Sequence, residues 1–262
     1  MKRLLIAFAV LLPAWTASAA QDDSDSRDYR VRVGLGAQLE PEFIGSEKHD
    51  LGPYFKVSVA RGSDLFKVSS PDDHFGIALI NKNRFSFGPG GNIESSRKDS
   101  EVGAPLGKVK TTVEAGIFAQ YLAKDDAFRL RGELRKGLGG HDGLVGSIGA
   151  DKIWRDGDNY VVTLGPRLLF SDASYQRAYF GVTPAAALAT GLPAYRPSGG
   201  LYAAALASGV TYQIGPRFGL FGYARYERLI GDAAKSPIVR ELGSRNQTSG
   251  GIGLSYIFNV RR

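Results

Sequence analysis

Most of this chain alternates between apolar and polar residues with a period of two, and this pattern limits its fold more than any other feature. In the segment 29–40, Tyr29 and Val31 share one side, whereas Arg30 and Arg32 lie on the other. Successive side chains of a β-strand point to opposite faces, whereas a helix would distribute these charges around its whole surface. The pattern therefore predicts strands whose two faces have different surroundings.

Twelve segments follow this pattern, and several have the length of about ten residues that a tilted strand needs to cross the hydrocarbon layer of a membrane. The pattern is weakest in 64–70, 74–81 and 84–91. The count is therefore twelve strands, with ten as the alternative, since barrels of this kind have even numbers. The segments are 29–40, 51–61, 64–70, 74–81, 84–91, 109–122, 127–136, 143–154, 159–170, 200–214, 217–229 and 247–260.

The connections between these segments alternate between short and long. Every second connection is tight and polar, as in Asn81-Lys82-Asn83 and Gly215-Pro216, whereas those near 92–108, 171–199 and 230–246 are much longer. Outer-membrane barrels have short periplasmic turns and long external loops. The sequence thus predicts an all-β protein, a transmembrane antiparallel up-and-down β-barrel, located in the bacterial outer membrane.

The first twenty residues have the layout of a secretory signal peptide. A positive start at Lys2 and Arg3 precedes an apolar run over 4–12, and small residues then lead to a cleavage site after Ala19 or Ala20. The alternative is a retained N-terminal anchor. We expect residues 1–20 to be removed and residues 21–262 to form one barrel domain.

Composition excludes several classes of function. The chain has no cysteine, so it has no disulfide framework or thiolate metal site. Its formal charge of +7 is spread out, without the lysine–arginine blocks typical of nucleic-acid binding. A basic exported protein more plausibly meets anionic outer-membrane lipid, such as lipopolysaccharide, or wall polymer. We expect no cofactor.

Charged residues on the polar side of the strands are predicted to face the barrel interior. One hypothesis is a narrow, anion-preferring passage. The alternative, which we favour, is a filled interior where these groups pair with one another. The predicted set has nine bases and four acids, namely Arg30, Arg32, Lys56, Lys110, Arg129, Arg131, Arg135, Arg167 and Arg225 with Glu114, Glu133, Asp151 and Glu227.

The long connection 171–199 contains the signals of a short helix. Thr183 can cap its start, Pro184 suits its first turn, and Gly191 with Pro193 ends it. Such a helix could fold into the barrel mouth and constrict it. The alternative is a local cap that orders a long loop.

The residues offer little for catalysis. The three histidines, His49, His74 and His141, all lie at predicted loop ends, and neither a nucleophile elbow nor a metal-ligand spacing is present. Lipid hydrolysis by a serine–histidine pair is the remaining enzymatic alternative. We expect a protein without catalytic, cofactor-binding or metal-binding residues.

Several stretches resemble the MipA/OmpV family of outer-membrane proteins. The stretches are Tyr-Phe-Gly-Val-Thr-Pro-Ala at 179–185, Gly-Leu-Pro-Ala-Tyr-Arg-Pro at 191–197, the whole of 221–239, and Gly-Ser-Arg-Asn-Gln at 243–247. Pro-Glu-Phe-Ile-Gly-Ser at 41–46 is similar to the family's first-loop motif, with Phe43 where tyrosine is more usual.

This resemblance implies a function as well as a fold. It implies a non-enzymatic scaffold linked to peptidoglycan remodelling, with a lytic murein transglycosylase and a murein synthase as partners. We expect such partners to meet the short turns, where Lys124, Asp125, Arg155 and Asp156 project. The alternatives are the anion-preferring pore or a surface adhesin whose long loops bind.

Overall fold

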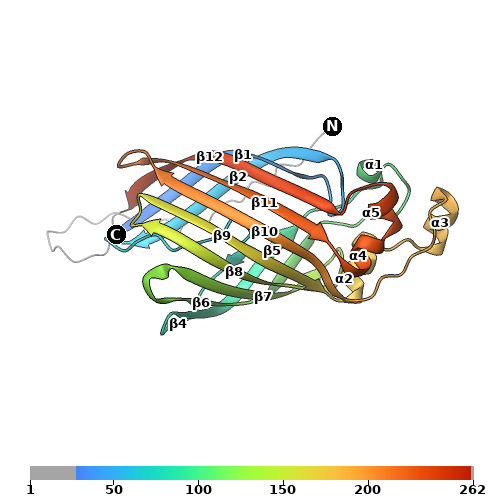
Figure 1. The fold of residues 1–262 in the computed structure, drawn as a ribbon, viewed down its shortest axis with the longest axis horizontal. Helices are drawn as coiled ribbons and strands as arrows, with labels where there is room; N and C mark the ends of the chain where they lie inside the picture. The colour runs from blue at the N-terminus through green and yellow to red at the C-terminus, as the bar shows by residue number, and fades with distance from the viewer. Residues whose placement is uncertain (1–27, 261–262) are drawn as a thin grey trace, which may run out of the picture.

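The computed structural model describes residues 28–260, which contain one antiparallel sheet of twelve strands that curves into a barrel-shaped wall (Figure 1). The predicted signal peptide and its cleavage site at Ala19 or Ala20 lie outside the described residues. The strands are β1 (Tyr29–Pro41), β2 (His49–Arg61), β3 (Phe75–Gly76), β4 (Ile80–Lys82), β5 (Phe85–Glu94), β6 (Thr112–Leu122), β7 (Phe128–Leu138), β8 (Leu144–Asp156), β9 (Tyr160–Ser171), β10 (Gly200–Gln213), β11 (Phe218–Leu229) and β12 (Asn246–Val260).

From β5 to β12, strand pairing follows the order of the chain, which confirms the predicted up-and-down topology. β1 pairs with β2 and also with β12, from Tyr29↔Val260 to Leu39↔Gly250, whereas β3 and β4 each pair with β5. This register sets Leu35 beside Leu254 on the outer face, where both side chains are exposed. Large apolar side chains on the outside of a barrel form the band that contacts lipid. The alternation in the sequence therefore arises because one face of each strand contacts lipid and the other faces the barrel interior.

The sheet is open at one place, between β2 and β3. Antiparallel pairing along the order β2-β1-β12-β11-β10-β9-β8-β7-β6-β5-β3 makes β2 and β3 run in the same direction. They cannot pair in an up-and-down wall, because a strand of opposite direction has to lie between them. Across the described residues, neither facing edge has a strand partner. We call this opening the seam.

The segment 62–74 connects β2 to β3 and runs inside the barrel. The prediction of a strand at 64–70 is wrong, since these residues form no ladder. Phe66 bonds to Asp158 and Arg155 near a short turn, and Pro71 reaches the opposite wall, where a Cβ on Gly209 would lie 3.0 Å from its Cδ. The count stays at twelve because the predicted strand 74–81 is divided into β3 and β4.

The two ends of the barrel differ as expected. The short turns include β4–β5, with Asn83 and Arg84 at positive φ, and a 3-10 turn at Lys124–Asp126. The opposite end carries the long loops and five short helices, α1 (Asp99–Val102), α2 (Ala173–Phe180), α3 (Pro184–Thr190), α4 (Gly231–Lys235) and α5 (Pro237–Glu241) (Figure 1). No helix among the described residues is long and apolar enough to span a membrane.

The loop-end helices pack into a core of their own. Phe180, Ala233 and Val239 are completely or almost completely buried there, next to Leu229 at the end of β11. The Ser236 hydroxyl donates a hydrogen bond of 2.7 Å to the Phe180 carbonyl, which joins α2 to the start of α5. The external end of the barrel is therefore an ordered cap.

Candidate functional site in the barrel interior

Near the loop end of the barrel, the interior contains two glutamates that are both ion-paired with one arginine. Arg135 Nε lies 2.8 Å from Glu114 Oε2, and its Nη1 also pairs with Glu133. His141 Nε2 lies 3.0 Å from the second oxygen of Glu114. His74 Nδ1 lies 2.8 Å from Glu133. Each of the two histidines therefore contacts a glutamate that is also ion-paired with Arg135.

Farther from the loop end, Asp151 is ion-paired with two arginines, and both arginines also pair with aspartates of segment 62–74. Arg129 Nε lies 2.9 Å from Asp151 Oδ2, and Arg167 Nη2 lies 2.7 Å from Oδ1. Asp73 accepts a hydrogen bond of 2.9 Å from Arg129 Nη2. Asp72 lies 2.7 Å from Arg167 Nε. Segment 62–74 is therefore ion-paired to β7 and β9.

Arg131 joins these groups into one network, because its Nε lies 2.7 Å from Glu133 and 3.6 Å from Asp73. The strand register explains the arrangement, since Arg129 lies opposite Asp151 across β7 and β8. Arg129 is only 1% exposed. Burying charges is costly unless each is paired and hydrogen-bonded, and here the pairs satisfy that condition.

The predicted interior charges divide into three groups. The network contains seven of them, Glu114, Arg129, Arg131, Glu133, Arg135, Asp151 and Arg167. Two further pairs stand apart from the network, Arg225 with Glu227 on β11, and Arg30 with Asp158 at 3.0 Å. Arg32 and Lys56 lie inside without an acidic partner within 4 Å in residues 28–260.

Lys110 differs from the expectation for this set. It is exposed and precedes β6, which begins at Thr112. The sequence alternation continues smoothly through this position, so periodicity alone places Lys110 inside a strand. The chain before β6 instead forms an isolated bridge between Arg97 and Val109.

Sequence reasoning missed Asp72, Asp73 and the role of His141. The two aspartates follow Pro71 in a stretch that reads as a turn, and no local pattern indicates partners on strands far away in the sequence. His141 lies in the β7–β8 connection and is buried, although a loop histidine is usually solvated. Only long-range pairing identifies these residues.

The predicted loop helix exists as α3, but it lies away from the barrel mouth. The Thr183 hydroxyl accepts a hydrogen bond from the Ala186 amide, Pro184 occupies the first turn, and Gly191 ends the helix at φ 77. Pro193 follows in the extended chain. Leu188 is 91% exposed, and α3 is the helix farthest from the strands in Figure 1. This position favours the alternative of a local cap that orders the loop.

α2 contributes aromatic side chains to a chamber in the barrel interior. The rings of Tyr175 and Tyr179 are tilted, with centroids 4.9 Å apart, and the ring of Tyr175 lies at the same distance from that of His141. Tyr202 of β10 extends this aromatic cluster. The cluster lines an outer chamber of about 1090 Å³.

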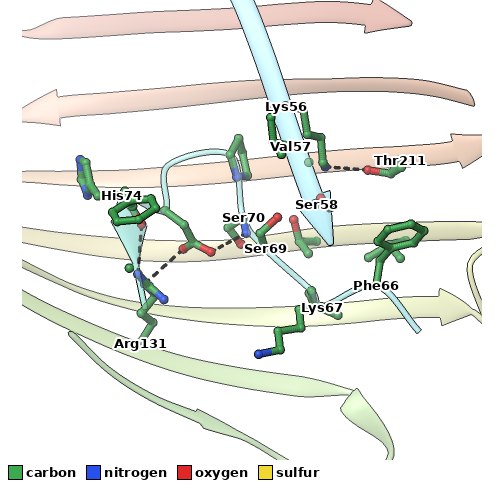
Figure 2. Close-up of a pocket in the computed structure, with 18 of the residues that line it drawn as sticks. Lys56, Val57, Ser58, Phe66, Lys67, Ser69, Ser70, His74, Arg131 and Thr211 are labelled. Atoms are coloured by element: carbon green, nitrogen blue, oxygen red, sulfur yellow. Dashed lines mark hydrogen bonds and ion pairs between the residues drawn. The ribbon is translucent and has the colours of Figure 1, made fainter. Parts of the chain in front are cut away.

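A second, inner chamber of about 400 Å³ lies on the other side of residues 71–75 (Figure 2). Pro71, Asp73 and His74 line both chambers, so this part of the interior segment lies between them. Lys56 points into the inner chamber from β2, and its Nζ donates a hydrogen bond of 2.8 Å to the Thr211 hydroxyl.

The three described histidines all contact other groups of the protein. His49 bonds to the backbone and hydroxyl of Thr248, whereas His74 and His141 contact glutamates. None of the three bonds to a serine hydroxyl within residues 28–260. Over the same residues, no group of three or more His, Cys, Asp or Glu side chains could hold a metal ion.

Comparison with known proteins gives one family. The model of the family described as MltA-interacting protein MipA matches residues 33–258. A search of curated proteins found no match.

Solved outer-membrane proteins are similar over most of their length. A KdgM porin is 11% identical, with 89% of this chain and 99% of the porin covered and a TM-score of 0.38. The outer membrane channel DcaP of Acinetobacter baumannii is 8% identical, with 89% and 97% covered and a TM-score of 0.41. An anion-selective porin from Comamonas acidovorans is 12% identical, with 89% and 100% covered and a TM-score of 0.36.

The family match spans nearly the whole chain and confirms the resemblance seen in the sequence stretches. It also agrees with a wall of lipid-facing strands that have short turns at one end and long loops at the other. The chain therefore belongs to the MipA family, and it is an outer-membrane β-barrel protein.

Proposed function

We propose that this protein is a non-enzymatic scaffold of the outer membrane that binds peptidoglycan-remodelling enzymes. One structural feature supports the proposal most: the chain itself occupies the interior, where Asp72 and Asp73 are ion-paired to Arg167 and Arg129. A barrel filled in this way serves as a rigid support. The family description names interaction with MltA, which supports a murein enzyme as the partner.

The short turns would supply the docking surface. Lys124, Asp125 and Asp156 are exposed at this end. Arg155 contributes less, because its guanidinium bonds inward to the Phe66 carbonyl and to Asp158. An ordinary interface takes roughly 20–30 residues a side. Several turns would therefore have to bind together, as one charged surface around the barrel rim.

Immobilised barrel tests this proposal with a lytic murein transglycosylase and a murein synthase as separate probes. We expect at least one enzyme to be retained, and the triple change Lys124→Ala, Asp125→Ala and Asp156→Ala to weaken retention about tenfold or more. The matched control is Lys98→Ala, Glu101→Ala and Lys235→Ala at the loop end, which leaves retention unchanged. If the barrel retains neither enzyme, the result contradicts the scaffold function.

A second candidate is an anion-preferring pore, and one observation favours it. Arg32 and Lys56 lie in the interior without an acidic partner within 4 Å in the part of the chain described. Rings of positive charge select anions in pores. Purified barrel in a planar bilayer would then carry current with a preference for anions. Absence of current, or equal passage of cations and anions, eliminates this candidate.

A further inference from the structure

The inner chamber contains two cations that have no acidic partner within 4 Å among residues 28–260. Arg32 is 3% exposed, and within the same residues its guanidinium has a single side-chain hydrogen bond, to Gln213 Oε1 at 3.3 Å. Lys56 hydrogen-bonds there to the neutral Thr211 hydroxyl and to no other side chain. A buried charge is costly without a counter-charge. These two cations thus differ from the paired arginines of the network.

The same chamber also contains buried polar atoms without partners. Among residues 28–260, Arg32 Nε, Ser70 Oγ and Thr163 Oγ1 are buried and make no hydrogen bond. All three residues line the chamber. A hydroxyl or guanidinium N–H donates to an anionic oxygen, and unsatisfied buried donors are rare in folded proteins. These atoms have almost no accessible surface in the structure, so an anionic oxygen in the chamber would reach them after a rotation of the side chains.

The chamber extends from these cations to the lipid-facing surface. Phe55 and Val57 line it, yet their side chains are 66% and 68% exposed on the outer face of β2. They lie beside the seam, where β2 has no strand partner within the described residues. Phe66, Phe75 and Phe118 add aromatic surface. The lining is therefore cationic at its buried end and apolar toward the bilayer.

We propose that the inner chamber binds a single-chain anionic amphiphile that enters from the outer membrane through the seam. Its head group, a carboxylate or phosphate, lies between Arg32 and Lys56 and accepts hydrogen bonds from Ser70 and Thr163. Its alkyl chain passes between Phe55 and Val57 into the lipid. Charge-assisted hydrogen bonds and apolar burial together recognise such a molecule, whereas either part alone is insufficient. This binding is separate from the scaffold function.

Dodecanoate labelled with ¹³C at its carboxylate tests the site, with the full barrel in phosphatidylcholine nanodiscs and empty nanodiscs as reference. We expect a bound carboxylate signal that Lys56→Met weakens at least tenfold and Lys56→Arg restores. Lys110→Met is the matched control, because it removes an exposed lysine outside the chamber and leaves binding unchanged. Thr163→Val removes one unpaired hydroxyl without changing side-chain volume, and we expect it to weaken binding several-fold in a folded barrel.

Competing ligands separate the parts of the proposal. Dodecyl phosphate displaces the probe, and its affinity relative to dodecanoate distinguishes phosphorylated lipids from fatty carboxylates as the natural source. If acetate or inorganic phosphate binds as tightly as dodecanoate, the alkyl chain contributes nothing to binding, and the proposal of an amphiphilic ligand is overturned. Equal displacement by dodecyl maltoside overturns the anion site. Unchanged binding in both Lys56→Met and Thr163→Val assigns the probe to another place and also overturns the proposal.

Discussion

At the residue scale, Asp151 shows how the interior charges depend on one another. Its two oxygens neutralise Arg129 and Arg167, which are both buried. Removing one partner of a buried ion pair costs about 3–5 kcal/mol when the remaining charge has no other partner. Here Arg129 keeps Asp73 and Arg167 keeps Asp72. We therefore expect Asp151→Asn to lower the free energy of unfolding by a smaller amount, about 2 kcal/mol, as measured by urea titration in detergent micelles. The control is Glu101→Gln, which breaks the exposed pair with Lys98 and costs below ~1 kcal/mol. A loss in Asp151→Asn no larger than in this control would contradict the network's role.

At the element scale, α2 begins at an aspartate whose charge stabilises the helix. Asp172 accepts a hydrogen bond of 3.0 Å from the Tyr175 amide. Burial alone would raise the pKa of Asp172, but the backbone hydrogen bonds at Tyr175, Leu144 and Ser174, together with the charge of Lys136, hold the pKa below its usual value. A carboxyl with a lowered pKa stabilises the fold above its unfolded pKa of about 4, and the stabilisation is lost as the pH falls through the lower, folded value.

We therefore expect amide hydrogen exchange in α2 to accelerate on acidification below about pH 4, after correction for the intrinsic exchange rate. Asp172→Ala should remove this pH dependence and cost about 1 kcal/mol, the usual worth of an N-cap. Thr183→Ala at the start of α3 serves as a comparison, because it removes a neutral cap that does not titrate. An acid response that persists in Asp172→Ala would assign the effect to another group.

The elements also show how far sequence determines structure here. Alternation and helix-capping residues are local features of the sequence. The long strands and the two ends of α3 could therefore be predicted without knowing which residues contact them in the fold. Segment 64–70 alternates too, yet it leaves the wall. Its path is set by Asp72 and Asp73, which pair with arginines more than 50 positions along the chain. Lys110 fails for the converse reason, since a local pattern does not show where a strand begins to pair.

At the scale of the whole molecule, the direction of the strands requires a segment that returns from the end of β2 to the start of β3. β2 and β3 run the same way, so the chain has to cross the barrel between them, either in the wall or inside. A wall position would satisfy the unpaired strand edges, which are costly in lipid. An interior position instead satisfies the buried arginines. The structure has the second arrangement.

A pair of cysteines tests this position directly. A Cβ on Gly209 would lie 3.0 Å from Pro71 Cδ and 3.5 Å from Pro71 Cγ, so the two chain segments are in direct contact at this point. We expect Pro71→Cys with Gly209→Cys to form a disulfide in the folded barrel, seen as loss of thiol labelling and faster migration of the unreduced protein. If the segment instead formed a wall strand that paired with β2 through the turn at 61–64, residue 73 would lie opposite Gly52. Asp73→Cys with Gly52→Cys would then cross-link, although no atom lies within 4 Å of a Cβ at Gly52 in the structure. Oxidation of the 71/209 pair and not of the 73/52 pair supports an interior segment, whereas the opposite result supports a wall strand.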